Sequence, residues 1–527
     1  MANPKTIKVA FYIEPLCRYA NNAQIDYSLE PIATLIKQLT NSDVKFVFKF
    51  ICSDVMQARL PQLLPASSDD IITIEEHEMQ AATQFGNAES IKHFYRYSLD
   101  TKKLHTIASI IKTRLNAHKF TPDIIFTNTT APHLKISCPD ALIVNYNIRE
   151  NNHPYPSYNS IDFGNNELPG HKLFAAQMLA YEPEFDEYKT IVSGRRSYLD
   201  FFKTSISGNN VIKQAKAQYK QVAFLPLGLN TPQTYAQSMF DTQDELLNYV
   251  AHNTPKTTAI IVTQHHMAGN FGHQLSYERL NYYADKFSNI IHVEQPSQNI
   301  EPHLIAKADY TICINQKHAI QALYLGKPYI GLMQGFSSVI SGLTLKDTHN
   351  YNFAKHQNSL QQDNALAWLF SHYFMLDNMY NHPGYLTSYL LGMLSKYRKN
   401  KKIGFKDLTQ LPDATQHLEY FANHTDSYKY NGFIDKVENG IIYGWACNKQ
   451  DLKKPVMVDI YIDDVHIKSC SAELYRRDIE QALGSAKHGF TFDIDEELAP
   501  KLANVRCTIS GTDFEIKPVP SVANGVE

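Results

Sequence analysis

Several features that define other protein classes are absent from this sequence of 527 residues. Its seven cysteines are scattered, odd in number and never spaced as C-x-x-C, which argues against a disulfide framework and a structural zinc site. No apolar stretch approaches the length of a membrane-spanning helix, and the N-terminus shows no secretory signal pattern. We therefore expect a cytoplasmic protein, with peripheral contact to a membrane surface left open.

A strong charge of one sign and the common nucleotide fingerprints are also missing. Fifty Lys and Arg against 53 Asp and Glu leave a net charge of −3, which gives no global reason to bind nucleic acid. Neither G-x-G-x-x-G nor G-x-x-x-x-G-K-[ST] occurs, which argues against a dinucleotide-binding site and against a P-loop. No acidic metal-binding motif stands out, and we expect no metal and no cofactor.

Short apolar runs alternate with helical patterns in most of the chain. Strands separated by helices of about 10–15 residues indicate βαβ units and a parallel sheet. We predict an α/β protein with two Rossmann-like domains facing a cleft, residues 1–205 and 206–400, joined through a polar, Pro-rich loop at 150–171. The strands expected are Ile7–Ile13, Val44–Ile51, Asp123–Phe126, Ala141–Tyr146, Val222–Leu227, Ala259–Thr263, Ile290–Val293, Tyr310–Ile314 and Tyr329–Leu332.

The pattern changes after the second α/β segment. A helical region over 364–400 ends in the basic run 396–402, which favours either a solvated helix end or contact with anionic lipid headgroups. Residues 425–520 alternate apolar and polar positions between turn residues, which predicts an antiparallel β domain. This third domain is expected to be sandwich-like and to carry no catalytic cluster.

Two stretches of the second domain carry the nucleotide-binding candidates. Asn315, Gln316, Lys317 and His318 stand between a predicted strand and a predicted helix. Free backbone N–H groups and the positive dipole end of such a helix suit a phosphate, although a plain α/β crossover with polar caps would look the same.

The other stretch follows the strand Ala259–Thr263. His265 stands just past its end and could bind or protonate a leaving phosphate, so we predict a catalytic role for it. His266 and Gln295 are added to the nucleotide-binding candidates. Zinc binding is conceivable because His273 is near, but no recognisable ligand spacing completes such a site.

The first domain supplies two carboxylate candidates. Glu150 follows a predicted strand and would serve as general acid or base toward an acceptor hydroxyl. Asp162 is the second carboxylate in the same polar segment. A polar loop with acidic residues is also common without any catalytic role.

These stretches resemble bacterial GT-B glycosyltransferases, and in particular retaining β-Kdo transferases and capsular polysaccharide transferases that use CMP-sugars. The similarity lies in Asn315-Gln316 followed by residues 321–328 (QALYLGKP), in Gln264-His265-His266, and in the Phe-Leu-Pro-Leu run at 224–227. The segment 432–490 resembles a β domain attached to bacterial glycosyltransferases, where its role is generally interaction or acceptor positioning.

The resemblance implies a transferase that moves Kdo or a related ulosonic or nonulosonic acid from a CMP donor to an oligosaccharide or lipid-linked glycan, in capsule or lipopolysaccharide assembly at the inner membrane. It also implies that residues 1–205 bind the acceptor, that residues 206–400 bind the donor nucleotide, and that the helix at the end of the second domain packs back toward the first. The family often has acidic residues after Phe-Leu-Pro-Leu, whereas this sequence has Asn230, an isostere of Asp that we include among the catalytic candidates. That departure keeps two alternatives open: a non-catalytic glycan-binding or assembly protein on a degenerate scaffold, and a CDP-polyol phosphotransferase.

Overall fold

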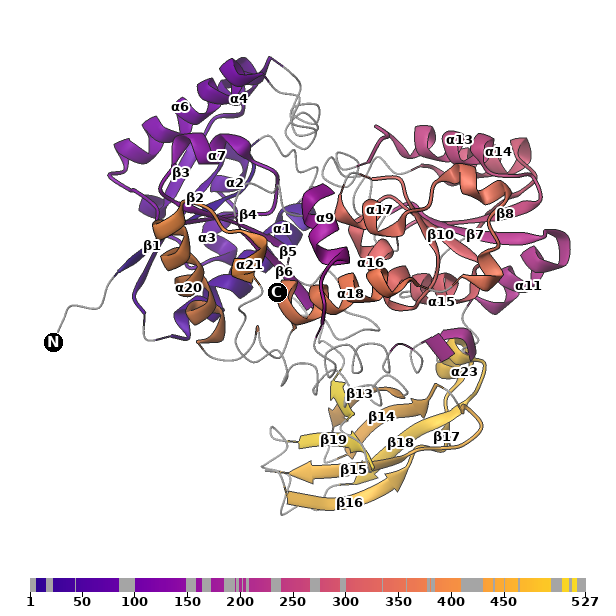
Figure 1. Cartoon of the computed structure of the whole chain (residues 1–527). Helices are drawn as coiled ribbons and strands as arrows, with labels where there is room; N and C mark the ends of the chain where they lie inside the picture. The colour runs from indigo at the N-terminus through magenta and orange to yellow at the C-terminus, as the bar shows by residue number, and fades with distance from the viewer. Residues whose placement is uncertain are drawn as a thin grey trace. The chain divides into compact units, whose positions relative to one another are not determined.

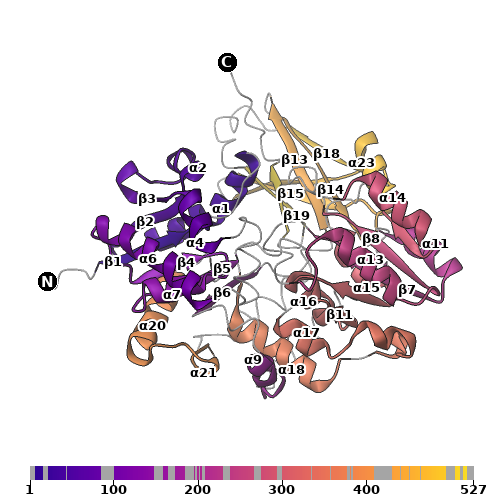
Figure 2. The same ribbon diagram turned by 90° about the horizontal axis from the view of Figure 1, so that it is seen from above.

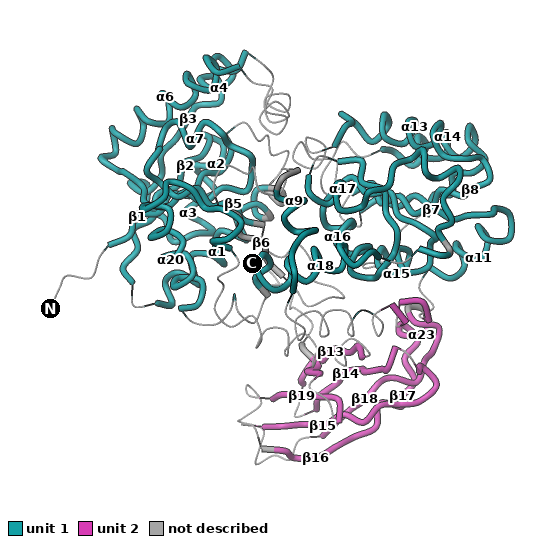
Figure 3. The backbone as a smooth tube through the Cα atoms, in the orientation of Figure 1, with its two compact units in different colours: residues 1–195, 207–418 teal, residues 196–206, 419–527 magenta. Residues whose placement is uncertain are grey.

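The computed structural model divides the chain into two compact units, residues 1–195 with 207–418 and residues 196–206 with 419–527 (Figure 3). The structure describes residues 6–15, 22–42, 44–84, 100–147, 158–163, 172–183, 195, 199–200, 202–204, 208–228, 238–265, 275–293, 300–333, 335–356, 358–376, 380, 384–408, 430–438, 441–449, 451–462, 465–493, 505–510 and 514–518.

Unit 1 contains two sheets, each the centre of a lobe (Figure 1). The first sheet has seven strands, of which β5, β4, β1, β2 and β3 are parallel and β6 and β12 are antiparallel to their neighbours. In sheet order these are β12 (Phe374–Leu376), β6 (Tyr158–Phe163), β5 (Leu142–Asn147), β4 (Ile124–Thr127), β1 (Ile7–Tyr12), β2 (Phe46–Ser53) and β3 (Ile71–Ile74).

Helices cover both faces of the first sheet because its parallel strands are apolar on both sides. The helices α4 (Glu76–Thr83), α6 (Thr101–Ala117) and α7 (Pro132–Ser137) lie on one face and share a core with it (Figure 1). The other face carries α1 (Asn22–Thr40), α2 (Asp54–Gln57), α3 (Leu60–Leu63) and α20 (Tyr385–Asn400).

The helix α20 lies beside the first lobe, although it follows the second lobe in sequence (Figures 1 and 2). Tyr397 donates a hydrogen bond to the carbonyl of Pro139 at 2.9 Å, and Arg398 pairs with Asp123. The 396–402 run therefore has part of its charge bound within the protein, as in the Lys401–Asp140 pair at 2.7 Å. Contact of this run with a membrane stays a prediction.

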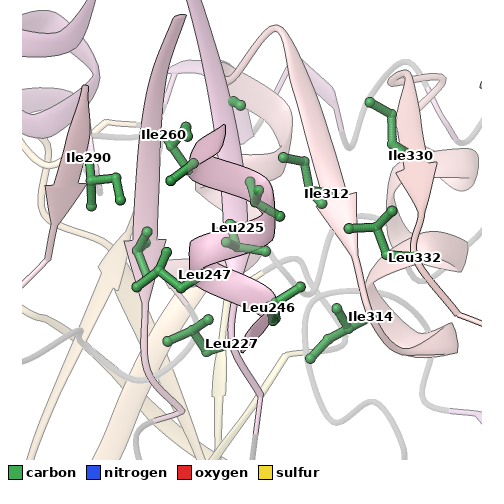
Figure 4. Close-up of a cluster of buried hydrophobic side chains, with 14 of the residues drawn as sticks. Leu225, Leu227, Leu246, Leu247, Ile260, Ile290, Ile312, Ile314, Ile330 and Leu332 are labelled. Atoms are coloured by element: carbon green, nitrogen blue, oxygen red, sulfur yellow. The ribbon is translucent and has the colours of Figure 1, made fainter. Parts of the chain in front are cut away.

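The second sheet has five parallel strands in the order β11-β10-β7-β8-β9. They are β11 (Tyr329–Gly331), β10 (Tyr310–Cys313), β7 (Gln221–Pro226), β8 (Thr258–Thr263) and β9 (Ile290–His292), with α11 (Asn209–Gln218), α13 (Gln243–Asn253), α14 (Tyr277–Lys286), α15 (Ile300–Lys307), α16 (Gln316–Tyr324) and α17 (Phe336–Ser341) around them. Leu246 and Leu247 of α13 belong to one core cluster with branched side chains of the sheet, among them Leu225 and Ile260 (Figure 4).

Unit 2 is built on an eight-stranded sheet, antiparallel except where β13 runs parallel to β20. In sheet order its strands are β16 (Val465–Ser471), β15 (Met457–Ile462), β19 (Val505–Ile509), β20 (Glu515–Pro518), β13 (Tyr430–Glu438), β14 (Ile441–Asn448), β18 (Lys487–Asp493) and β17 (Leu474–Tyr475). Strands from both ends of this sheet bury their apolar residues in one shared core, while Ile479 and Leu483 of α23 (Arg477–Leu483) pack near Trp445.

Glycines in unit 2 occupy positions where strands approach closely. A Cβ at Gly432 would lie 2.6 Å from the carbonyl oxygen of Trp445, and one at Gly444 would lie 2.5 Å from the ring of Phe490. Backbone and a buried ring cannot move easily, so only glycine fits at these positions. Close backbone and ring contacts therefore explain why glycine stands at positions 432 and 444 of the segment that resembles the glycosyltransferase-associated β domain.

The fold class predicted from the sequence is confirmed: two Rossmann-like α/β sheets and a C-terminal antiparallel β region. The domain limits 1–205, 206–400 and 425–520 stay predictions. The prediction of a continuous loop over 150–171 is wrong at Tyr158–Phe163, which forms β6 between β5 and β12.

Candidate functional site

The strand order of the second sheet defines a switch point between β7 and β10. The chain runs from β7 to β8 and β9 in one direction, and then returns to β10 on the other side of β7. In doubly wound sheets, ligands bind outside the carboxyl ends of the strands at such a point. The loop after β10 leads directly into α16, which places residues 315–318 at this edge.

The first turn of α16 is fixed by a side-chain cap. The side chain of Asn315 accepts a hydrogen bond from the backbone N–H of His318 at 3.1 Å. This cap satisfies one of the donors that a helix start leaves open, and the N–H groups of Gln316 and Lys317 belong to the same turn. Asn315, predicted to contact a nucleotide, therefore caps the helix in this structure.

The other end of α16 is held by a buried ion pair. Arg195 donates through Nε to the carbonyl of Tyr324, the last residue of α16, at 2.8 Å. Its terminal nitrogen lies 2.6 Å from Asp363 of α18 (Leu360–Trp368). Asn358 donates to the same carboxylate at 3.1 Å and to the carbonyl of Leu323 at 3.0 Å. These contacts fix the position of the helix that presents residues 316–318.

Glu301, in the first turn of α15, is the central charged group of this edge. Its Oε2 lies 2.9 Å from Nε2 of His318 and 3.8 Å from the ammonium of Lys317. The side chain of His318 is 2% exposed and that of Glu301 is 14% exposed, whereas Lys317 reaches solvent at 31%. The carboxylate therefore fixes a buried imidazole and leaves the lysine accessible to a ligand.

The charge on Glu301 is stabilised by its neighbours. Burial raises the pKa of its carboxyl, but the charge and hydrogen bond of His318 and the charges of Lys317 and His265 lower it further, to about 2. Glu301 is thus ionised at neutral pH. The charge of His265, which lies two residues past the end of β8, thus lowers the pKa of the same carboxyl that Lys317 and His318 contact.

Buried carboxamides connect the loops around this edge. Gln243 is 1% exposed, donates to the carbonyl of Gly228 at 3.2 Å and accepts from the N–H of Leu275 at 3.0 Å. Gln264 also donates to the carbonyl of Leu275. Because Gly228 follows β7 and Gln264 follows β8, these bonds hold both loop starts in place.

The structure brings together three of the sequence-predicted residues, Lys317, His318 and His265, around a residue that the sequence analysis missed. Glu301 stands before β10, so its relation to the other three depends on how α15 packs beside α16. An acidic residue in the first turn of a helix was the only signal in the sequence. Gln316 starts α16 next to them.

The remaining predicted residues are not tested by the structure. Glu150, Asn230, His266 and Gln295 lie outside the described residues. The backbone of Asp162 is described and lies in β6 opposite Asn145 of β5, not in a loop. Its polar neighbours in the sequence suggested a loop, but the ladder hydrogen bonds with β5 and β12 form a strand.

Neither a metal centre nor a membrane span is found in the described part of the chain. Among these residues, no three His, Cys, Asp or Glu side chains gather as metal ligands. No helix within the described ranges has both the length and the apolar character that crossing a bilayer requires.

No protein-family model matches the chain, and no curated protein matches it by sequence. Among solved structures, it is similar to the KpsC β-Kdo 2,7 transferase of Thermosulfurimonas dismutans, with 14% identity and a TM-score of 0.29 over 55% of this chain and 88% of that chain. The UDP-GlcNAc 2-epimerase of Neisseria meningitidis bound to UDP-GlcNAc has 12% identity and a TM-score of 0.26, over 79% and 99%. The α,α-trehalose 6-phosphate synthase of Burkholderia multivorans has 9% identity and a TM-score of 0.36, over 76% and 99%. The order of the strands in the sheets, and not these similarities, establishes the fold.

Proposed function

We propose that the protein is a glycosyltransferase whose second lobe binds the phosphate of a nucleotide-activated sugar. The observation that carries this proposal is the group of Lys317, His318, Glu301 and His265 at the switch-point edge of the second sheet. Backbone N–H groups of the first turn of α16 and the Lys317 ammonium suit the phosphate oxygens. The net charge of the chain is −3, so an anionic donor must be held by such a local site.

The residues of this edge would act mainly by stabilising the leaving group. In the transfer, the bond between the anomeric carbon and the phosphate oxygen breaks, and the nucleotide leaves as an anion. Lys317 would balance that charge, and His265 would donate a hydrogen bond or a proton to it. Glu301 is a positioning residue that orients His318. The acceptor oxygen forms the new bond to the anomeric carbon, and its proton passes to a carboxylate base, for which Glu150 and Asp162 are the candidates.

The finer proposal is a CMP-linked donor carrying Kdo or a related ulosonic acid, transferred to a surface glycan without a metal ion. It follows from the sequence resemblance described above. A product assay with CMP-Kdo and with CMP-linked nine-carbon acid sugars, in the presence of EDTA, tests the donor and the metal requirement together. Formation of product only with a UDP- or GDP-sugar would overturn the CMP assignment and leave the glycosyltransferase proposal standing.

Nucleotide binding at α16 is tested with the Lys317→Ala variant. We expect the variant to bind CMP about tenfold more weakly, because a charge-assisted contact to phosphate is lost. Titration calorimetry with CMP, UDP and GDP measures the affinity, and Lys346→Ala, which removes an exposed lysine of the same lobe, is the matched control. Unchanged CMP affinity in Lys317→Ala would contradict phosphate binding by this lysine. The absence of thermal stabilisation of the unaltered protein by any of the three nucleotides would count against a transferase.

The role of His265 is tested by turnover. We expect His265→Ala to reduce the rate of donor cleavage by about 100-fold, as for the loss of a general acid, while CMP affinity changes little. Stopped-time assays of nucleotide release with saturating donor give this rate. Full turnover in the variant would exclude His265 from the reaction.

A further inference from the structure

The helix α13 lies on the outer side of the second lobe, with one face in the core and the other open to solvent (Figure 1). Leu246, Leu247 and Val250 are buried against the sheet. The opposite face of the helix, together with the residues just before it, lines a hollow of about 530 Å³. The lining residues include Met239, Phe240, Glu245, Tyr249, His252 and Asn253. Because the helix stands between this hollow and the sheet, the hollow is not part of the site around Glu301.

The chain that leads into α13 is fixed where it forms one wall of the hollow. Ser238 is buried and forms a β-bridge with Met333, and its hydroxyl donates to the carbonyl of Phe240 at 2.8 Å. The N–H of Asp241 donates to Oε2 of Glu245 at 2.8 Å. Hydrogen bonds on both sides of Phe240 therefore hold this wall, which lowers the cost of ordering it when a ligand binds.

Aromatic side chains form much of the apolar part of the hollow. The ring centroids of Phe240 and Tyr249 lie 5.1 Å apart, with the rings tilted by 49°. Phe240 is buried, whereas Tyr249 is 38% exposed and Met239 is 58% exposed. The face of an aromatic ring carries partial negative charge, which attracts cations. The apolar part of the hollow therefore suits an organic cation better than an anion.

Two of the polar side chains offer hydrogen-bond acceptors to the hollow. Nδ1 of His252 lies 2.8 Å from the carbonyl of Asn248, which can only accept, so in the neutral imidazole Nδ1 carries the proton and Nε2 is an acceptor. The amide nitrogen of Asn253 donates to the carbonyl of Tyr249 at 2.9 Å. The side-chain oxygen of Asn253 is thereby left to accept from a ligand.

Glu245 supplies the negative charge of the hollow. Its Oε2 accepts from a backbone N–H, and among the residues that the structure describes no cation forms an ion pair with this carboxylate. The neighbouring Asp244, in contrast, pairs with Arg279. The carboxylate of Glu245 can therefore balance the positive charge of a ligand.

We propose that this hollow binds an organic ammonium ion. Glu245 is the charge partner, and the ring of Tyr249 provides a cation–π contact. With the carboxylate, the acceptors of His252 and Asn253 match the three N–H donors of a primary ammonium group. The volume of the hollow falls within the range of small-molecule sites, roughly 300–1,000 Å³. A polyamine and an amino sugar are the two sources of this chemistry, and the proposal does not depend on the proposed function.

The test uses the full chain and saturation-transfer difference NMR, with cadaverine, spermidine and glucosamine as probes. Pentanediol and N-acetylglucosamine are the matched neutral compounds. We expect the amines to bind with an affinity that falls as the salt concentration rises, and the neutral compounds to bind at least about tenfold more weakly. Tighter binding of cadaverine and spermidine assigns the site to a polyamine, and tighter binding of glucosamine assigns it to an amino sugar.

Two variants locate the binding in the hollow. Glu245→Gln keeps an oxygen for the N–H of Asp241 but removes the charge, so we expect amine affinity to fall about tenfold. Tyr249→Leu keeps an apolar side chain but removes the ring, and we expect a loss of about threefold. Glu278→Gln changes an exposed carboxylate of α14 that does not line the hollow, and this matched control keeps the amine affinity of the unaltered protein.

Thermal unfolding followed by circular dichroism shows whether the variants stay folded. Equal amine affinity in Glu245→Gln and the unaltered protein, equal binding of the neutral compounds, or no binding of any amine would overturn the proposal. None of these measurements uses a nucleotide. A protein that binds amines here but no nucleotide would therefore support this site and contradict only the proposed function.

Discussion

Replacing Arg195 by methionine is expected to lower the free energy of unfolding of unit 1 by about 3–5 kcal/mol, because the variant leaves a buried carboxylate without its cation. The side chains of Arg195 and Asp363 are 13% and 9% exposed, and their atoms lie 2.6 Å apart. Methionine keeps much of the arginine's length, so the loss comes from the charge and the hydrogen bonds. The bond from Arg195 to the last carbonyl of α16 is lost as well.

A matched variant and a second substitution check the origin of this effect. Arg279 pairs with Asp244 at 2.8 Å, but these side chains are 45% and 40% exposed, so Arg279→Met should change the free energy of unfolding far less than Arg195→Met does. Adding Asp363→Asn to Arg195→Met should restore part of the stability, because a neutral amide oxygen can still accept from Asn358. Chemical denaturation followed by circular dichroism measures all four proteins. Equal losses in the two arginine variants would contradict the buried-pair explanation.

The sequence allows the parallel sheets to be predicted because their strands are buried on both faces and read as apolar runs. All six residues of β8 are buried, and the prediction Ala259–Thr263 falls within one residue of it. The strand β6 could not be predicted in this way. It mixes polar and apolar residues in a segment with two prolines just before it, and it forms because β5 and β12 supply hydrogen bonds on both sides. The partner β12 is about 200 residues away, so no local pattern shows it.

The same distinction applies to the site. The position of Lys317, His318 and His265 at the carboxyl edge could be predicted because all three follow closely after parallel strands, while their roles stay a prediction. The proximity of Glu301 to Lys317 and His318 could not be predicted, because it arises from the packing of α15 against α16. The buried hydrogen bonds from His133 to Tyr12 and from Tyr12 to Glu14 could not be predicted either, because Tyr12 belongs to an apolar strand and His133 is more than 100 residues away from it.

The neutral variant Glu301→Gln is expected to reduce stability at neutral pH by roughly 3 kcal/mol, the free energy equivalent of lowering a carboxyl pKa from 4.5 to about 2. The glutamine oxygen can still accept from Nε2 of His318, so the variant removes the charge and keeps the hydrogen bond. The sign of the pH dependence follows from the lowered pKa. A carboxyl with a lower pKa in the folded state stabilises the fold above its unfolded pKa, and this contribution is lost as the pH falls toward 2.

The stability difference between the unaltered protein and Glu301→Gln should therefore be largest above about pH 5 and shrink steadily below it. Urea denaturation from neutral pH to about pH 3 follows the difference, and Glu278→Gln, which changes an exposed carboxylate of α14, shows the background dependence. CMP affinity gives a second readout, because removing one negative charge beside Lys317 favours an anion while the uncharged amide holds His318 less firmly. A stability difference that stays constant with pH would mean that Glu301 acts through packing, and the charged contacts with His318, Lys317 and His265 would not be the reason for its position.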